Sequence, residues 1–219
     1  MFVRPCSMLA ACCAVLLFTT AAHAQNGGSE RESVAFGVKG GVSASNWSHS
    51  YRGEVTTFDF RTGVTAGGFV EIPITSRLTL QPEILWSMKG AISPDFGGLA
   101  TRDLTYLDLP LLVRYSLAVT TRKRKVSPYV FGGPTVGLLL SATSWYRWGG
   151  SRTGQDVKSH MSSADFGMVI GGGVQIHRLS VECRYALGLT NILNSDSFPS
   201  LLEVSEKNRA LAVMVGMRF

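Results

Sequence analysis

The sequence predicts an all-β fold, an eight-stranded antiparallel up-and-down transmembrane β-barrel, from three observations. Apolar and polar residues alternate over long segments, as expected for strands that bury one face. These segments are roughly 10–16 residues long, whereas an average globular strand has about 5–6 residues and a tilted membrane-crossing strand about 9–11. Charged residues make up only 16% of the chain, and 24 of its 219 residues are glycine, a composition typical of strands with an apolar exterior and tight turns.

Residues 1–24 have the organisation of a secretory signal peptide. Arg4 provides the basic start, residues 7–18 the apolar centre, and Ala22-His23-Ala24 a small-x-small cleavage site. The apolar run is too short to span a bilayer of about 30 Å as a helix, which argues against a membrane anchor. A lipoprotein signal ending at Cys12 is a second alternative, although the apolar run continues past that cysteine.

Residues 25–33 are polar and form an expected flexible periplasmic lead-in, and residues 34–219 form the predicted outer-membrane barrel domain. After removal of the signal peptide, Cys183 is the one remaining cysteine, so we expect neither an internal disulfide nor a cysteine metal cluster. No later stretch approaches 18 consecutive apolar residues, which predicts that no transmembrane helix follows.

The alternation defines eight predicted strands, and the clearest lies at 77–89. Its even positions are apolar or proline, whereas most of its odd positions are polar or charged. Glycines dilute the pattern at 126–141, and the first two segments alternate more weakly. In chain order the predicted strands are 34–46, 59–72, 77–89, 105–116, 126–141, 165–176, 178–190 and 210–219.

The connections between these strands alternate in length. Short links are predicted near 73–76, 118–125 and 177–178, and long loops at 47–58, 91–101, 142–161 and 191–206. Short turns at one end and long loops at the other are typical of outer-membrane barrels, with the long loops outside and both termini in the periplasm. Because a proline lacks the N–H that a ladder needs, we also expect β-bulges at Pro82, Pro110 and Pro134.

The charged residues on the polar faces distinguish two kinds of barrel. A soluble lipocalin-like barrel has the same alternation, with its polar face turned to water. The polar faces here carry too few charges for that, which favours a membrane barrel with these groups in the lumen. The predicted lumen-facing charges are Lys39, Arg61, Glu71, Arg77, Glu83, Lys89, Asp108, Arg114, Asp165, Glu182, Arg184 and Arg218.

An eight-stranded barrel is just wide enough to be filled by side chains, and an unpaired charge in its lumen is costly. We therefore expect these groups to pair and to fill most of the lumen. The alternative is a narrow polar path for small solutes.

Several segments resemble the small PorT-like, "porin family" outer-membrane β-barrel proteins. The resemblance covers essentially the whole mature chain. It is carried by GVKGGV at 37–42, LQPEIL at 80–85, YLDLPLL at 106–112, PYVFGGP at 128–134, RYALGLTNI at 184–192 and the terminal GMRF at 216–219. The resemblance implies a barrel in the outer membrane of a Gram-negative envelope but no single activity. Some family members are associated with type IX secretion.

The predicted loop 142–161 carries an aromatic and basic group of residues, Trp145, Tyr146, Arg147 and Trp148. Such side chains can stack on sugars or bind anionic lipopolysaccharide. They can equally form the aromatic girdle that is usual at the rim of these barrels. At the opposite, periplasmic end, Arg122 to Lys125 form a basic turn that is either solvated or a docking site.

Catalysis has little support in the sequence. His49-Ser50, and His160 with Ser162 or Asp165, could be written into a catalytic scheme, but no orienting acid is identifiable. We expect a protein that is not an enzyme, without a metal or another cofactor. Its expected partners are outer-membrane lipid, lipopolysaccharide and the barrel-assembly machinery, for which Phe219 is the terminal aromatic signal, and nucleic acid is not expected.

These observations predict a barrel with a largely side-chain-filled lumen that acts through its extracellular loops in binding, adhesion or envelope organisation. A narrow diffusion pore is the first alternative. An accessory role in protein secretion is the second.

Overall fold

The computed structural model describes residues 33–51, 54–57, 59–95, 98–117, 126–148, 151–190 and 204–219. The predicted signal peptide and nearly all of the lead-in lie outside these residues. The unit Ser33–Phe219 is described here by itself. Its elements are β1 (Ala35–Tyr51), β2 (Glu54–Thr57), β3 (Asp59–Pro73), β4 (Leu78–Asp95), β5 (Gly98–Ser116), β6 (Val126–Trp148), β7 (Ser151–Asp156), the 3-10 helix η1 (Lys158–His160), β8 (Ala164–Ile176), β9 (Leu179–Gly188) and β10 (Val204–Arg218).

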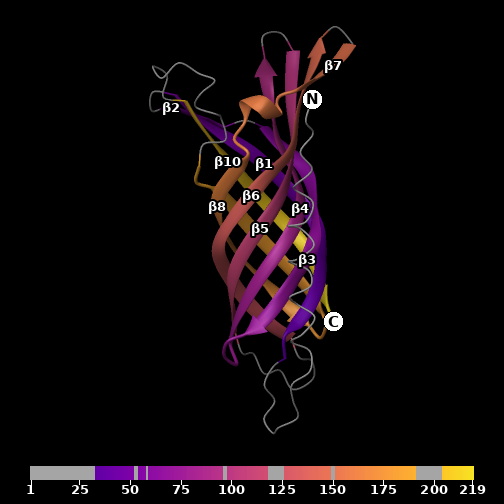
Figure 1. Cartoon of the computed structure of the whole chain (residues 1–219), viewed down its shortest axis with the longest axis vertical. Helices are drawn as coiled ribbons and strands as arrows, with labels where there is room; N and C mark the ends of the chain where they lie inside the picture. Colours follow the sequence, from indigo (N-terminus) through magenta and orange to yellow (C-terminus); the bar gives the residue numbers. More distant parts are fainter. Residues whose placement is uncertain are drawn as a thin grey trace, which may run out of the picture. The chain divides into compact units, whose positions relative to one another are not determined.

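Eight long strands form a closed antiparallel barrel, which confirms the predicted fold class. The order around the wall is β10-β9-β8-β6-β5-β4-β3-β1, and β10 pairs with β1 to close it. The short strands β2 and β7 pair with β1 and β6 beyond the barrel wall (Figure 1). Since each barrel strand has a neighbour on both sides, its backbone N–H and C=O groups find partners without water.

The two faces of the wall are reversed relative to a soluble protein. Large apolar side chains such as Val42, Ile84 and Val213 are about half exposed on the outside. Polar and charged side chains, such as Gln81 and Glu182, are buried inside. Exposed apolar surface costs roughly 25 cal/mol per Å² in water, so this outer face suits lipid.

Three of the predicted long loops are mostly strand, and the prediction was wrong in this respect. Strand β1 continues through most of 47–51, β4 and β5 remain paired up to Asp95 and Gly98, and β6 runs to Trp148 before β7 pairs back onto it. The ladder continues because its register is already set in the wall. The alternation fades there because both faces of such an extension meet water. The predicted loop 191–206 lies mainly outside the described residues.

The predicted bulges at the three prolines are also wrong. At each of Pro82, Pro110 and Pro134, two successive residue pairs are missing from one of the two ladders of the strand. The pairing then resumes in the same register. The missing N–H removes a local hydrogen bond without adding a residue to the strand. The register shifts lie elsewhere, between Phe60 and Thr65 and between Thr105 and Tyr106.

Tight turns close one end of the barrel, which we call the short-turn end. The β3–β4 turn is held by Ile74 N–H and Thr75 N–H, which donate to the Leu78 carbonyl at 2.8 and 3.0 Å. The β8–β9 turn places His177 at a φ of 57°, the left-handed conformation that a two-residue hairpin requires. The C-terminus lies at the same end, where the Phe219 N–H donates to the Phe36 carbonyl at 2.8 Å (Figure 1). We call the opposite end, where β2 and β7 project, the hairpin end.

Candidate functional site

Most of the charged residues that were predicted to face the lumen lie inside the barrel. Eight are buried, namely Lys39, Glu71, Glu83, Asp108, Arg114, Asp165, Glu182 and Arg184, and Arg61 and Lys89 are half-buried. The prediction that Arg77 faces the lumen was wrong. Arg77 lies in the exposed β3–β4 turn, where the alternation of a strand no longer determines the direction of the side chain. Arg218 is partly exposed at the short-turn end and still reaches a luminal partner, Glu71.

Two cations and two carboxylates form a central cluster across the lumen. Lys39 Nζ lies 2.7 Å from Glu83 Oε1 and 3.1 Å from Glu182 Oε1. Arg184 Nη1 lies 2.8 Å from Glu83 Oε2, and its Nη2 also pairs with Glu182. The four charges cancel, and all four side chains are almost completely buried. A closed network of this kind satisfies the strict requirement that buried charges be paired.

Neutral and aromatic side chains complete this central cluster. Gln81 Nε2 donates to Glu83 at 2.7 Å, and the Tyr129 hydroxyl donates to Glu182 at 3.1 Å. Lys39 lies 4.7 Å from the centre of the Phe69 ring, a cation–π distance. The charge pattern did not single out these three side chains, although all three stand on the inward face of their strands.

A second cluster lies toward the short-turn end. Arg114 Nη1 donates to Glu71 Oε1 at 2.6 Å, and another of its nitrogens donates to Gln175. Its guanidinium is stacked on the Tyr129 ring, 3.7 Å from the ring centre. Arg218 adds a second cation, 3.3 Å from Glu71. Tyr129 thus joins the two clusters, and together they fill this half of the lumen.

The half of the lumen toward the hairpin end is less densely paired. Lys89 Nζ lies 2.8 Å from Asp108 Oδ1 and 4.8 Å from the centre of the Tyr106 ring. Asp165 accepts a hydrogen bond from the Thr190 hydroxyl at 2.9 Å. Arg61 and Asp103 form a more exposed pair at 2.7 Å.

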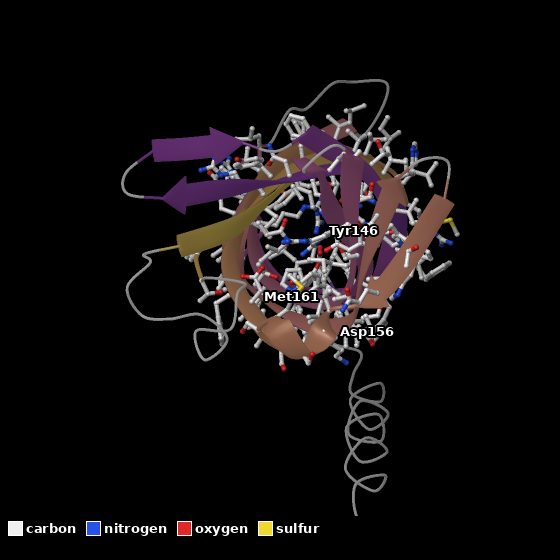
Figure 2. The ribbon with its side chains drawn as sticks, turned by 90° about the horizontal axis from the view of Figure 1, so that it is seen from above. Tyr146, Asp156 and Met161 are labelled. Carbon is white, nitrogen blue, oxygen red and sulfur yellow. The ribbon has the colours of Figure 1, made fainter. Side chains whose placement is uncertain are left out.

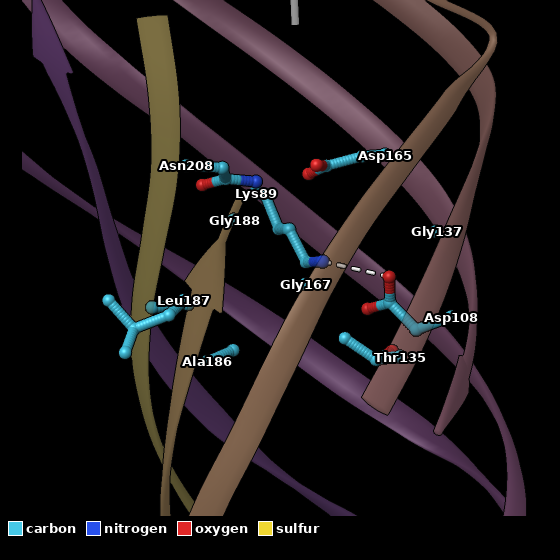
Figure 3. A pocket seen from close by; sticks show the side chains of 11 residues that line it. Lys89, Asp108, Thr135, Gly137, Asp165, Gly167, Ala186, Leu187, Gly188 and Asn208 are labelled. Atoms are coloured by element: carbon cyan, nitrogen blue, oxygen red, sulfur yellow. Dashed lines mark hydrogen bonds and ion pairs between the residues drawn. The ribbon is translucent and has the colours of Figure 1, made fainter. Parts of the chain in front are cut away.

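Two small cavities lie among these groups. One of about 20 Å³ is bounded by Lys89, Asp108, Asp165 and Asn208, together with glycines of β6, β8 and β9 (Figure 3). Another of about 50 Å³ is bounded by Ser43, Arg184 and several small side chains. A water molecule needs roughly 10–15 Å³ by this measure, so the cavities hold about one and a few waters. Neither is large enough for an organic solute.

An apolar cluster, which we call the plug, lies in the half of the lumen toward the hairpin end and consists of Leu104, Tyr106, Leu139, Ala142 and Met161. Met161 follows η1 and enters the lumen from the β7–β8 connection (Figure 2). The connection is held to β6 by the Val157 N–H, which donates to Ala142 at 3.1 Å, and by Lys158 Nζ, which donates to Leu140 at 2.8 Å. The sequence analysis missed this plug, because a lone methionine in a polar connection carries no periodic signal.

The predicted aromatic group belongs to a strand and not to a loop. Trp145 and Tyr146 stand on the part of β6 that pairs with β7 beyond the wall. The Trp145 ring packs against Gly154, where a Cβ atom would lie 2.6 Å from it. Tyr146 is exposed, and the side chains of Arg147 and Trp148 lie outside the described residues. The group therefore lies on a protruding sheet, and its role as a girdle or a binding surface stays a prediction.

The described residues contain no cluster of three or more His, Cys, Asp or Glu side chains able to hold a metal ion. None of their helices is long and apolar enough to cross a membrane. The side chains of His49 and His160, the two histidines of that weakly supported catalytic scheme, lie outside the described residues. Ser162 donates to the Ala164 carbonyl at 2.9 Å.

A closed barrel with an apolar exterior and a charged, filled interior defines an integral outer-membrane β-barrel protein. Residues 23–194 match the family model described as "Outer membrane protein beta-barrel domain", so the chain belongs to this family and is located in the outer membrane. The narrower PorT-like resemblance stays a prediction. No curated protein matches the chain by sequence.

Solved structures of other small outer-membrane barrels are similar to this chain. Ail, the attachment invasion locus protein of Yersinia pestis, is 11% identical with a TM-score of 0.43, covering 84% of this chain and 98% of its own. Neisserial surface protein A is 14% identical with a TM-score of 0.46, covering 86% and 100%. OprG of Pseudomonas aeruginosa is 12% identical with a TM-score of 0.47, covering 84% and 95%.

Proposed function

We propose that this protein is a non-conducting barrel that acts as a binding or adhesion protein through the strands at its hairpin end. The observation that carries the proposal is the closure of the lumen at successive levels. The Arg114 cluster and the Arg184 cluster fill one half, and Met161 caps the other. We therefore expect no continuous path for a small solute through the interior that the described residues form.

The extended hairpins support a role at the surface. Beyond the wall, β4, β5, β6 and β7 continue as one sheet, and β1 with β2 and the start of β10 continues as another. We infer that these sheets face the exterior and that the short turns and both termini face the periplasm, as in other outer-membrane barrels. Rigid strands that project from a membrane present backbone edges and side chains to a partner with little loss of entropy on binding.

The first test is planar-bilayer conductance of the refolded mature chain, with a heat-modifiable gel shift to establish that the barrel has formed. We expect no discrete current steps from the wild type. A variant with Glu83, Arg114, Arg184 and Met161 all replaced by alanine should produce steps once the gel shift shows that it has folded, because it removes side chains from both clusters and from the plug. Salt-dependent steps from the folded wild type would overturn the proposal and support the narrow pore instead.

The second arm of the test measures attachment. A Gram-negative strain that displays the wild type is compared with one that displays a variant in which residues 147–152 are replaced by Asn-Gly. We expect the shortened β6–β7 hairpin to lose attachment to immobilised lipopolysaccharide or to host cells. A third strain, in which the β4–β5 hairpin is shortened by the same length, tests the other hairpin of this sheet. Equal attachment of all three strains, at equal surface levels, would argue against a binding role for the hairpin end.

A further inference from the structure

Strand β7 has one free edge. It pairs with β6 along its whole length, and its other edge meets no strand among the residues that the structure describes. Such an edge presents a row of unpaired N–H and C=O groups, which can pair with another extended chain. Figure 1 shows β7 at the hairpin end, where it projects beyond the wall. The edge therefore lies clear of the lipid-facing part of the barrel.

One hydrogen bond identifies the backbone groups on this edge. The Val157 N–H donates to the Ala142 carbonyl at 3.1 Å, so these two residues form a hydrogen-bonded pair in the register of the β6–β7 ladder. Hydrogen-bonded and non-hydrogen-bonded pairs alternate along an antiparallel ladder. The N–H and C=O groups of Arg152, Gly154 and Asp156 therefore point away from β6, toward the free edge.

The three residues on this edge are complementary to a second copy of themselves. If two β7 strands pair antiparallel about Gly154, Arg152 of each copy stands opposite Asp156 of the other. Opposite charges across an antiparallel pair are stabilising, and like charges are destabilising. Centring the pair on Arg152 or on Asp156 would set like charges against each other, so the charges favour the register about Gly154.

Contacts within the hairpin hold this edge in an extended shape. A glycine weakens a strand, but the Trp145 ring covers Gly154, where a Cβ atom would lie 2.6 Å from the ring. Asp156 is exposed, and its Oδ1 accepts a hydrogen bond from the Lys158 N–H at 2.9 Å. The edge is thus formed before a partner arrives, which lowers the entropy lost on pairing.

Two other projecting strands are less suited to pairing. Beyond its last pair with β3, the free edge of β4 contains Pro94, which lacks the N–H that a new ladder needs. Strand β2 has only four residues, whereas β7 has six and no proline.

The direction of β7 determines where the second copy lies. In Figure 1, β7 projects beyond the wall at a slant to the barrel axis. A two-fold axis along the membrane normal leaves the axial component of a strand's direction unchanged, so two copies in one membrane cannot align β7 antiparallel. A two-fold axis in the membrane plane reverses that component. Antiparallel pairing therefore requires two barrels whose hairpin ends face each other.

We propose, on the basis of the binding role assigned above to the hairpin end, that β7 joins this protein to a second copy in the outer membrane of a neighbouring cell. The two strands pair antiparallel about Gly154, with Arg152 of each copy opposite Asp156 of the other. A single pair of six-residue strands is weak, but many copies in two facing membranes act together and hold the cells to each other.

Charge exchange between two cell populations tests this pairing. A Gram-negative strain with short lipopolysaccharide displays one form of the protein per population, each population carries its own fluorescent label, and flow cytometry counts the aggregates. Wild-type cells should aggregate with one another. Arg152→Asp cells and Asp156→Arg cells should each lose aggregation, because like charges then face each other at both ends of the strand pair. Mixing these two populations should restore aggregation, because opposite charges face each other again.

Disulfide formation tests the register. In the proposed pairing, Thr153 stands opposite Gln155 of the second copy in a non-hydrogen-bonded pair, where Cα atoms lie about 4.5 Å apart, within the reach of a disulfide. With Cys183→Ala in every chain, oxidation of Thr153→Cys cells mixed with Gln155→Cys cells should give a covalent dimer, and neither population alone should. Thr153→Cys cells mixed with Lys158→Cys cells are the matched control, because Lys158 is exposed but lies beyond the strand.

Three outcomes would overturn the proposal. The first is a mixture of Arg152→Asp and Asp156→Arg cells that stays dispersed although both variants are folded at the surface by the heat-modifiable gel shift. The second is a disulfide dimer that forms only when both cysteine variants are made in the same cell, which would place the two copies in one membrane. The third is a wild-type strain that attaches to lipopolysaccharide or host cells without aggregating, which would leave the binding role of the hairpin end intact.

Discussion

Glu83 holds the centre of the lumen together, because it accepts hydrogen bonds from Lys39, Arg184 and Gln81. Its side chain is completely buried, so none of these donors can be replaced by bulk water. These three residues come from three strands, β1, β9 and Glu83's own strand β4. At the scale of single residues, this part of the lumen is therefore an interlocked network in which Glu71, Glu83 and Glu182 each pair with two cations.

Replacing Glu83 by alanine should destabilise the barrel by about 3–5 kcal/mol, the usual cost of leaving one side of a buried pair without its partner. Two cations, Lys39 and Arg184, would then share Glu182 alone. The free energy of unfolding in urea, measured in lipid vesicles, checks this expectation. Arg77→Ala is the control and should change stability by less than about 0.5 kcal/mol, because Arg77 is exposed in a turn. Equal stability of both variants would show that the network contributes little.

Strands β1 and β10 form the seam that closes the barrel, and the seam depends on close backbone contact. A Cβ atom at Gly41 would lie 2.0 Å from the Val213 carbonyl oxygen, a distance that no side chain tolerates. The neighbouring Gly40 is different, since its nearest neighbour would be 3.6 Å away. At the scale of the elements, adjacent glycines in one strand thus have separate roles.

Gly41→Val should prevent closure or reduce the folded fraction severely, because backbone atoms of β10 cannot move aside without breaking the ladder. Gly40→Val should fold as the wild type does, since its Cβ would make ordinary van der Waals contact, 3.6 Å from the Thr65 carbonyl oxygen. The folded fraction after refolding into detergent, measured by the heat-modifiable gel shift, distinguishes the two. A Gly41→Val barrel that forms in wild-type yield would contradict the tight seam.

At the scale of the whole molecule, the C-terminal residue completes the closed wall. The Phe219 N–H donates to Phe36, and its ring is 63% exposed. The ring makes little contact with the folded barrel, so the stability of the barrel should depend only weakly on Phe219. We predict that Phe219 acts during assembly instead, as the signal read by the insertion machinery.

Deletion of Phe219 should therefore lower the amount of barrel in the outer membrane several-fold while leaving refolding into detergent unchanged. Quantitative blotting of membrane fractions, together with refolding yields in vitro, measures both. Phe60→Ala is a suitable control, because Phe60 is equally exposed, at 64%, but internal to the chain. Equal loss of refolding and of membrane level would indicate a structural role for Phe219.

Much of the barrel could be predicted from local pattern. The period of two identified the wall strands and their apolar face, because successive side chains on any strand point to opposite sides. It also indicated which charges enter the lumen, except at Arg77, which lies in the turn just before β4 begins at Leu78. It did not predict the strand extensions, since water on both sides of a projecting hairpin removes the alternation that a lipid boundary imposes.

The sequence by itself determined the strands, the apolar exterior and the expected route out of the cell, because these depend on residues close together in the chain. Only the tertiary structure decided which charges meet. Glu83 lies 44 residues from Lys39 and 101 from Arg184, and the stagger of the closed wall brings all three to one level. The same closure placed Met161 against Leu104, Tyr106 and Leu139. Pairing inside a barrel depends on how the strands are staggered around it, and no short stretch of sequence contains that information.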